Sequence, residues 1–333
     1  MLRAALIGCG KIGSEFADDP NIADVYTHAG AWQACPGVEL VAVCDADAGR
    51  AHRCAKRWNV EKWFTDSGEM LNSIRPELVS VCTPDSTHHA MISAALETQG
   101  VRAILAEKPL ARTLSEAQQL AGHASKLGIA LAVNYSRRYA AGHRAIAHKL
   151  QGGLIGTIRQ VRGCYTKGTT HNGTHWFDWA RMLVGEISSV QGFDMLHEEG
   201  DDATLDVRLE FTNGAVGYLS ALDHRNYSLF EIDILGTVGR VRIFDSGHRC
   251  QIDLAGESPY YSGYRTLLPG DVIDGGMRDT LLHAATDLVE ALRAGRPPTC
   301  PATDAVRALA IADAAQRSVA LGGTPILLPH VEV

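Results

Sequence analysis

A glycine-rich loop near the start of the chain is the first segment whose residues could do chemistry. Gly8-Cys9-Gly10-Lys11-Ile12-Gly13 follows the apolar run Ala4 to Ile7. Glycines at this spacing let the backbone turn sharply and approach a pyrophosphate, while a following helix points its first N–H groups at the anion. The position of the loop, between an expected strand and an expected helix, favours a dinucleotide site over a plain glycine turn. We predict cofactor contacts from Gly8, Gly10, Lys11, Ile12 and Gly13.

An acidic residue, Asp45, ends the next apolar run. A carboxylate there would accept hydrogen bonds from the adenosine ribose hydroxyls and repel a 2′-phosphate, which favours NAD over NADP. The spacing from Gly13 to Asp45 exceeds the usual distance of about 20 residues, and we assign the excess to an insertion over Phe16 to His28. Two alternatives stay open. Asp45 could be only a helix N-cap, a role that Asp47 could equally fill, and Arg50 could soften the preference against the phosphate.

Two further polar motifs follow apolar runs that we expect to be strands. The first is Cys82-Thr83-Pro84-Asp85-Ser86-Thr87-His88, which would also suit a turn that caps a helix, and the second is Glu107-Lys108-Pro109. A doubly wound sheet binds its ligands at the carboxyl ends of its strands. Lys108 is a catalytic candidate, with a solvated surface lysine as the alternative, and the proline permits a cis bond before it. We place at the cofactor site Thr83, Pro84, His88, Glu107 and Lys108.

Two histidines stand four residues apart in His171-Asn172-Gly173-Thr174-His175-Trp176-Phe177-Asp178. Histidines at this spacing on one helix face can hold zinc. No nearby Glu or Cys completes such a site, and a third ligand would have to come from a distant residue such as His88, His89 or His248. We therefore expect no metal.

The elements that must position these residues change in type along the chain. In the first third, short apolar runs alternate with segments of helical spacing, which predicts βαβ units and a doubly wound parallel sheet. The expected strands cover 4–7, 40–44, 78–82, 103–106 and 130–133, and the expected helices cover 47–58, 88–99 and 115–127. We assign residues 1–125 to a dinucleotide-binding domain of α/β class.

Longer alternating strands begin at about Ile158 and are separated by turns suited to hairpins. This pattern predicts an α+β domain with a largely antiparallel sheet over residues 126–333. Its expected strands cover 159–165, 203–211, 215–223, 229–235 and 238–244, and two final helices cover 276–294 and 304–320.

Composition narrows the function further. Hydrophobic residues make up 46% of the 333 residues and charged residues 21%, the balance of a globular protein. The formal net charge of −7 gives no electrostatic reason to bind nucleic acid or an anionic membrane. No apolar run reaches the roughly 20 residues that cross a bilayer. The apolar segment at the start of the chain is also too short for the apolar region of a signal peptide. Because the eight cysteines form no Cys-x-x-Cys pair, we expect a reduced, cytoplasmic protein.

The motifs occur in the order seen in the glucose–fructose oxidoreductase / inositol dehydrogenase / rhizopine catabolism (Gfo/Idh/MocA) family. Asn134-Tyr135-Ser136-Arg137-Arg138-Tyr139 resembles the family's next motif, and the similarity extends over the whole chain, more loosely after about residue 190. The resemblance implies an N-terminal Rossmann domain. It also implies a C-terminal domain with a large open sheet, whose exposed face would make a homodimer or homotetramer.

The same resemblance assigns a role to the second histidine of the pair. In the family a Gly-x-His-x-x-Asp element opens a long helix, and its histidine, here His175, faces the nicotinamide. Members such as inositol dehydrogenase usually carry an aspartate four residues earlier, where this chain has His171. This departure leaves open whether His171 orients His175, contacts the substrate, or only caps the helix.

We therefore expect hydride transfer between NAD and a secondary hydroxyl or ketone of a sugar, cyclitol or nucleotide-sugar. His175 would exchange the hydroxyl proton and Lys108 would hold the oxygen. Two other functions stay open: a dinucleotide sensor without catalysis, which would need neither residue, and a reductase of a tetrapyrrole or imine. Hydroxyl or phosphate contacts are expected from His171, Asn172, Arg137, Arg138 and Tyr165, although the arginines could instead form an ion pair with the Rossmann domain.

Overall fold

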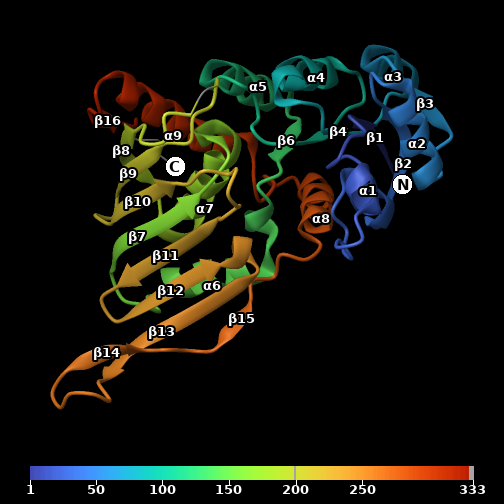
Figure 1. Cartoon of the computed structure of the whole chain (residues 1–333). Helices are drawn as coiled ribbons and strands as arrows, with labels where there is room; N and C mark the ends of the chain where they lie inside the picture. Colours follow the sequence, from blue (N-terminus) through green and yellow to red (C-terminus); the bar gives the residue numbers. More distant parts are fainter. Residues whose placement is uncertain (199, 330–333) are drawn as a thin grey trace. The chain divides into compact units, whose positions relative to one another are not determined.

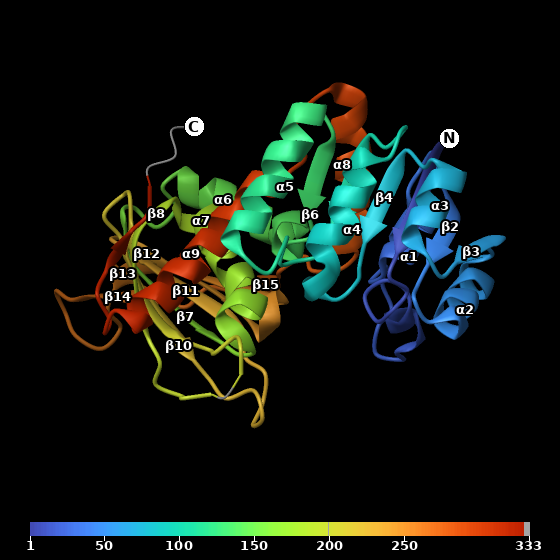
Figure 2. The same ribbon diagram turned by 90° about the horizontal axis from the view of Figure 1, so that it is seen from above.

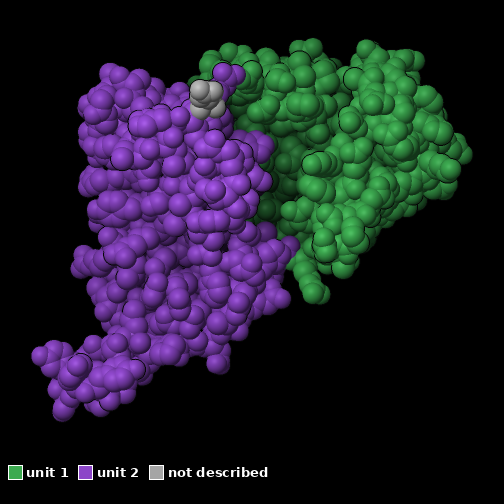
Figure 3. Space-filling view, in the orientation of Figure 1, with its two compact units in different colours: residues 1–139, 278–306 green, residues 140–277, 307–333 purple. Residues whose placement is uncertain are grey.

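The computed structural model describes residues 1–198 and 200–329 and divides the chain into two compact units (Figure 3). Unit 1 comprises residues 1–139 and 278–306, and unit 2 comprises residues 140–277 and the residues from 307 onward. The boundary expected near residue 125 lies within helix α5 (Leu114–Leu127) of unit 1. A segment from late in the chain therefore returns to complete the dinucleotide-binding unit.

Unit 1 contains a six-stranded parallel sheet with the order β3-β2-β1-β4-β5-β6 (Figure 1). This arrangement confirms the predicted doubly wound sheet. The prediction was possible because strands buried on both faces appear in the sequence as continuous apolar runs. The edge strand β3 was not predicted, since it has only three residues and two of them are exposed. The strands are β1 (Leu2–Ile7), β2 (Val38–Cys44), β3 (Lys62–Phe64), β4 (Leu78–Val81), β5 (Ala103–Ala106) and β6 (Ala130–Val133).

Helices cover both faces of this sheet (Figures 1 and 2). One face carries α1, α2 and α8, of which α8 packs on α1 and β5, and the other face carries α3, α4 and α5. The remaining bounds are α1 (His28–Ala34), α2 (Ala48–Trp58), α3 (Ser67–Ile74), α4 (Asp85–Glu97) and α8 (Thr280–Ala294).

Between the glycine loop and α1 the chain leaves the helical path, and we call this segment, residues 14–27, the excursion. The backbone leaves the glycine loop through a short 3-10 helix (Glu15–Asp18) and returns at α1. There the N–H groups of His28 and Ala29 donate to the carbonyl oxygens of Ile12 and Gly13 at 3.0 Å each. The excursion explains the long spacing between Gly13 and Asp45. It ends at Thr27, so His28 belongs to the helix and not to the predicted insertion.

Unit 2 is built on a ten-stranded sheet with the order β14-β13-β12-β11-β7-β10-β9-β8-β16, in which β15 pairs with β13. Every described pairing is antiparallel except β7 with β10, in agreement with the prediction. The strands are β7 (Ile158–Tyr165), β8 (Ile187–Phe193), β9 (Asp206–Phe211), β10 (Val216–Ala221), β11 (Glu231–Gly236), β12 (Gly239–Phe244), β13 (Arg249–Glu257), β14 (Arg265–Leu268), β15 (Val272–Asp274) and β16 (Ile326–Leu327).

Two glycines let helices pack closely on this sheet. The register places Gly163 of β7 and Gly192 of β8 in one cross-strand row with Leu219 and Val207, hence on the same face. Helix α7 (Thr174–Val184) seats its Trp176 indole against Gly163, and helix α9 (Ala302–Ala320) passes over Gly192. Helix α6 (Ala141–Gln151) packs beside α7.

None of the described helices combines the length and the apolar character needed to cross a lipid bilayer.

Replacing Gly163 by Ala should destabilise unit 2, because the new Cβ would lie 2.3 Å from Nε1 of Trp176. We expect a loss of about 1–3 kcal/mol in the free energy of unfolding, measured by urea denaturation. Gly122→Ala is the matched control, since a Cβ there meets no atom within 4 Å and should stabilise helix α5 by about 0.5–1 kcal/mol. Equal stability of the two variants would contradict the packing described here.

Candidate active site

The glycine loop after β1 uses its glycines for two different purposes. Gly8 has a φ of +95°, and a Cβ on Gly13 would lie 2.1 Å from the carbonyl oxygen of Gly8, so the fold itself requires glycine at both positions. A Cβ on Gly10, in contrast, meets no atom within 4 Å. The missing side chain of Gly10 therefore leaves open space beside the backbone, which suits the close approach of a pyrophosphate. Lys11 is exposed, and Ile12 is half-buried.

Asp45 lies at the carboxyl end of β2 and holds the same loop in place. Its Oδ2 accepts from the N–H of Cys9 at 2.9 Å, and its Oδ1 accepts from the N–H of Asp47 at 2.9 Å. Asp47 is the N-cap of α2, where it accepts from the N–H of Arg50 at 2.9 Å. The N-cap role considered for Asp45 therefore belongs to Asp47.

Arg50 points at two carboxylates. Its Nη1 lies 3.5 Å from Oδ1 of Asp45 and its Nε lies 3.3 Å from Oε1 of Glu15. These charges, that of Asp45 foremost, raise the pKa of the guanidinium. Arg50 is thus engaged with acidic groups.

The loop after β4 contains a polar atom that suits a ligand. The Oγ1 of Thr83 is buried and has no hydrogen-bond partner among the described residues. Buried polar atoms are almost always paired in folded proteins. This Thr83 hydroxyl and the open space at Gly10 both lie at strand ends, and both fit a bound dinucleotide. Such a dinucleotide would supply the hydride acceptor.

His88 ties two loops of unit 1 together. The ring is 1% exposed, its Nδ1 lies 2.6 Å from the carbonyl oxygen of Pro109, and its Nε2 lies 2.8 Å from that of Thr83. Carbonyl oxygens only accept, so both contacts are hydrogen bonds when each ring nitrogen carries a proton. These contacts indicate that His88 fixes the two loops expected to bind the cofactor. Pro84, which directly precedes α4, is exposed.

Glu107 is a buried carboxylate directly before Lys108. Its Oε1 accepts from Nε2 of His28 at 3.0 Å and from Nδ2 of Asn134 at 2.7 Å, and its Oε2 accepts from the N–H of Lys108 at 3.3 Å. Burial raises the pKa of Glu107, but the hydrogen bonds from His28 and Asn134 and nearby positive charge, that of Lys108 included, outweigh it, and the net shift is downward. Lys108 is half-buried, and the bond to Pro109 is cis.

The two arginines after β6 differ in their surroundings. Nη1 of Arg138 lies 3.0 Å from Oδ2 of Asp304, and both side chains are largely buried. This ion pair within unit 1 is the alternative considered from the sequence. Burial lowers the pKa of Arg137 to about 10.

In unit 2, the histidine segment begins with a π-helical turn (Gly168–Gly173) that continues into α7. Asp202 caps this turn. Its Oδ1 accepts from the N–H of Thr170 at 2.7 Å and its Oδ2 from the N–H of His171 at 2.8 Å. The His171 side chain is exposed. His175 lies half-buried in the first turn of α7 with its ring edge-on to Phe230, at 6.5 Å between centroids.

The other expected polar contacts of unit 2 are used inside the fold. The Tyr165 hydroxyl donates to the carbonyl oxygen of Leu205 at 2.8 Å and accepts from the N–H of the same residue at 2.9 Å. Tyr165 is fully buried, which favours a structural role. Nδ2 of Asn172 donates to the carbonyl oxygen of Thr166 at 2.8 Å. Asp178 is buried, and its Oδ1 lies 3.6 Å from Nη1 of Arg181.

Metal-ligand geometry occurs away from the histidine pair. Within the described part of the chain, Glu198, Asp223 and His224 place ligand atoms within 4.8 Å of one another. Neither His171 nor His175 belongs to this group, so the zinc alternative for the pair gains no support.

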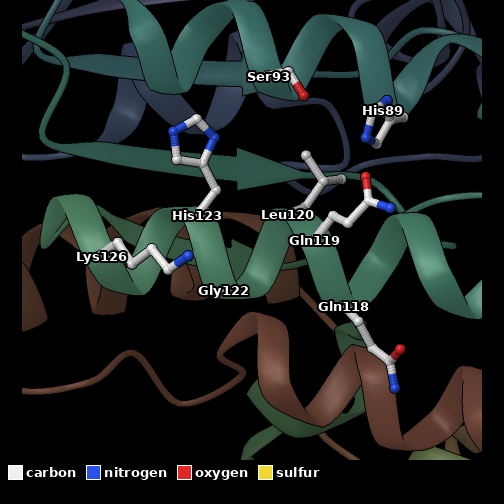
Figure 4. Close-up of a pocket in the computed structure, with 8 residues that line it drawn as sticks. All are labelled: His89, Ser93, Gln118, Gln119, Leu120, Gly122, His123 and Lys126. Atoms are coloured by element: carbon white, nitrogen blue, oxygen red, sulfur yellow. The ribbon is translucent and has the colours of Figure 1, made fainter.

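A surface groove lies between α4 and α5 (Figure 4). It shares no residue with the expected cofactor site. Its lining residues are His89, Ser93, Gln118, Gln119, Leu120, Gly122, His123 and Lys126.

Sequence reasoning missed His28 and Asp202. His28 lies 79 positions before Glu107 in the chain, and Asp202 lies 31 positions after His171. Neither stands in a motif. A buried donor for Glu107 could have been sought, because an ionised carboxylate in a strand-end motif needs one, but nothing local identifies which residue supplies it.

Two family models match the chain. The model described as "Oxidoreductase family, NAD-binding Rossmann fold" matches residues 2–135, and the GFO/IDH/MocA C-terminal domain matches residues 143–242. Together they span most of both units.

Curated relatives and solved structures agree with these matches. The scyllo-inositol 2-dehydrogenase (NAD(+)) of Bacillus subtilis is 29% identical over 276 residues, which cover 74% of this chain and 75% of the relative. The D-glucoside 3-dehydrogenase of Escherichia coli is 26% identical, covering 73% of this chain and 77% of the relative. Levoglucosan dehydrogenase in complex with NADH and L-sorbose shares the fold, with a TM-score of 0.80 and 21% identity over 99% of both chains.

The two kinds of glycine predict opposite effects of the same substitution. Gly10→Ala should leave the thermal unfolding midpoint nearly unchanged and weaken NADH binding at least about tenfold, because the methyl occupies the space beside the backbone. Gly13→Ala should lower the midpoint, since its Cβ would lie 2.1 Å from the carbonyl oxygen of Gly8. Fluorescence titration and calorimetry measure the two effects. Unchanged NADH affinity in Gly10→Ala would argue against the loop as the pyrophosphate site.

Proposed function

Because the chain belongs to the Gfo/Idh/MocA family of NAD-binding oxidoreductases, we propose that it transfers hydride between NAD and a secondary hydroxyl or ketone of a sugar, cyclitol or nucleotide-sugar. The relatives named above act on an inositol, a glucoside and levoglucosan, which supports a polyhydroxylated substrate. The observation that carries the proposal is Lys108. It follows a buried, hydrogen-bonded carboxylate at the carboxyl end of β5, the edge at which such sheets bind ligands.

The proposed chemistry divides between two side chains. Oxidation removes a hydride from carbon to nicotinamide C4 and a proton from the hydroxyl, leaving a ketone. His175 is the proposed proton acceptor, since imidazole titrates near neutral pH. Lys108 is the proposed cation that holds the oxygen as its charge changes. His171, exposed beside the start of α7, and Asn172 are the proposed hydroxyl contacts.

The preference for NAD over NADP is part of the proposal. Asp45 presents a carboxylate at the end of β2, where a 2′-phosphate would lie. Arg50, the cation that could accept that phosphate, is already 3.5 Å from Asp45 and 3.3 Å from Glu15. Both features disfavour a 2′-phosphate.

A second copy of this chain is the proposed partner. The open face of the unit 2 sheet carries exposed Tyr218 and the ion pair of Arg240 with Asp233. An uncovered sheet face with both apolar and paired charged groups suits a symmetric interface. Light scattering should report a dimer or tetramer, and a monomer at micromolar concentration would contradict this part of the proposal.

A sensor and a reductase of a flat apolar substrate are the rival functions. A sensor needs neither Lys108 nor His175, so NADH binding without turnover on a broad polyol panel would favour it. A reductase of a tetrapyrrole or imine would need an apolar surface, and the polar segment with exposed His171 and half-buried Asn172 disfavours it.

Absorbance at the NADH band should reveal turnover when the protein is screened with NAD and NADP against sugars, cyclitols and nucleotide-sugars. We expect a higher kcat/KM with NAD than with NADP. Lys108→Ala and His175→Ala should each lower kcat at least about 100-fold, with NADH affinity largely retained. His52→Ala, an exposed histidine of α2, is the control. Full turnover by either active-site variant would remove that residue from the mechanism.

A further inference from the structure

Behind Lys108, unit 1 buries a line of polar side chains from three separate elements. The Trp32 indole of α1 donates from Nε1 to Oγ of Ser80 on β4 at 2.7 Å. Oγ of Ser80 lies 2.9 Å from Nδ1 of His28, and Nε2 of His28 lies 3.0 Å from Oε1 of Glu107. Trp32, Ser80 and His28 are each 0% exposed. Because bulk solvent does not reach these side chains, a hydrogen bond lost between them would be costly.

The chemistry of the end groups fixes the direction of these hydrogen bonds. An indole can only donate, so Ser80 accepts from Trp32 and has one proton to give. Its contact with His28 is therefore satisfied when Ser80 donates to Nδ1. His28 then carries its proton on Nε2 and donates it to Glu107. A proton on Nδ1 would leave the Ser80 hydroxyl proton without an acceptor among the described contacts.

Glu107 ends the line as an acceptor from neutral donors. Its Oε1 accepts hydrogen bonds from His28 and Asn134, and its Oε2 accepts one from the backbone N–H of Lys108. Three donors stabilise the ionised carboxylate in a site that is 8% exposed. The charge of the neighbouring Lys108 also favours the ionised form of this carboxylate.

The backbone of His28 also connects this line of side chains to the glycine loop. The N–H of His28 donates to the carbonyl oxygen of Ile12 at 3.0 Å, so the histidine stands on the helical turn directly beyond the loop despite its distance along the sequence. The backbone that would hold the pyrophosphate and the residue that would hold the substrate oxygen are thus connected through one residue, His28, by its backbone N–H on one side and its imidazole on the other.

We propose that His28 is a positioning residue for Lys108: as the neutral Nε2–H tautomer, set by Trp32 through Ser80, it holds Glu107 ionised and fixed against the lysine backbone. The proposal rests on the proposed function, because Lys108 is the residue being positioned. His28 itself touches neither cofactor nor substrate in this account.

The tautomer of His28 is directly measurable without turnover. Long-range ¹H–¹⁵N NMR on protein labelled with [¹⁵N]histidine distinguishes the two ring nitrogens, and the spectrum of His28→Gln identifies the His28 signal among the 14 histidines. At neutral pH we expect a proton on Nε2 and none on Nδ1. Ser80→Ala should leave the proton on Nε2, which Glu107 still accepts, and should shift the Nδ1 signal because that nitrogen loses the hydrogen bond from Ser80. A proton on Nδ1 of the wild-type ring, alone or with one on Nε2, overturns the proposal.

Two substitutions of His28 separate positioning from packing. Gln can donate from its amide nitrogen to Glu107 and accept from Ser80 with its amide oxygen, whereas Leu fills the space and does neither. His28→Leu should lower kcat at least about tenfold, because a catalytic group then loses its alignment, while NADH affinity changes little. His28→Gln should recover most of kcat. Equal kcat for the Leu and Gln variants would reduce His28 to a packing residue.

Leu71→Ala supplies the control for general destabilisation. Leu71 is an apolar residue of α3, 1% exposed and outside the hydrogen-bonded line, so its truncation should lower the unfolding midpoint and leave kcat unchanged. The two proposals can also fail separately. A fully active Lys108→Ala would refute the proposed function and leave the tautomer result standing. An inactive Lys108→Ala with a fully active His28→Leu would refute only the positioning role.

Discussion

One buried charge, the carboxylate of Glu107, determines the arrangement of the strand ends in unit 1. An ionised group at that depth is costly unless hydrogen bonds replace its water, and these come from α1, from the end of β6 and from the Lys108 backbone. Its donors must therefore occupy particular places. That requirement brings an imidazole from beyond the glycine loop into the core and places a lysine at the edge where the cofactor is expected.

The same device recurs at two other points of the chain. Asp45 accepts from the N–H of Cys9 in the glycine loop, and Asp202 accepts from the N–H groups of Thr170 and His171 before α7. In each case a carboxylate holds the backbone of a segment that is expected to meet cofactor or substrate. Hydrogen bonds from amides to ionised acceptors are about twice as strong as neutral ones. Because the donors are backbone N–H groups, these hydrogen bonds fix the segments without using their side chains.

Local spacing was enough to predict the parallel sheet and the positions of the glycine loop, Asp45 and Lys108 at its strand ends, because each lies directly after a buried strand. The sequence did not reveal α1, since the chain leaves the helix after Gly13 and re-enters it at His28. Nor could it reveal the roles of His28 or Asp202. Their partners are distant in the sequence, and one sequence carries no signal for such pairs. The burial of Tyr165 likewise depends on Leu205, to which no motif connects it.

The ionisation of Glu107 tests this account most directly. Carbon-13 NMR of protein labelled at the glutamate Cδ follows each carboxyl group as the pH is lowered, and Glu107→Gln assigns the signal. Hydrogen bonds from His28 and Asn134, together with nearby positive charge that includes Lys108, hold the pKa of Glu107 below its ordinary value in spite of burial. Its signal should therefore stay that of a carboxylate while the exposed glutamates take up protons. A Glu107 that becomes protonated with the exposed glutamates, or at higher pH, would contradict the account.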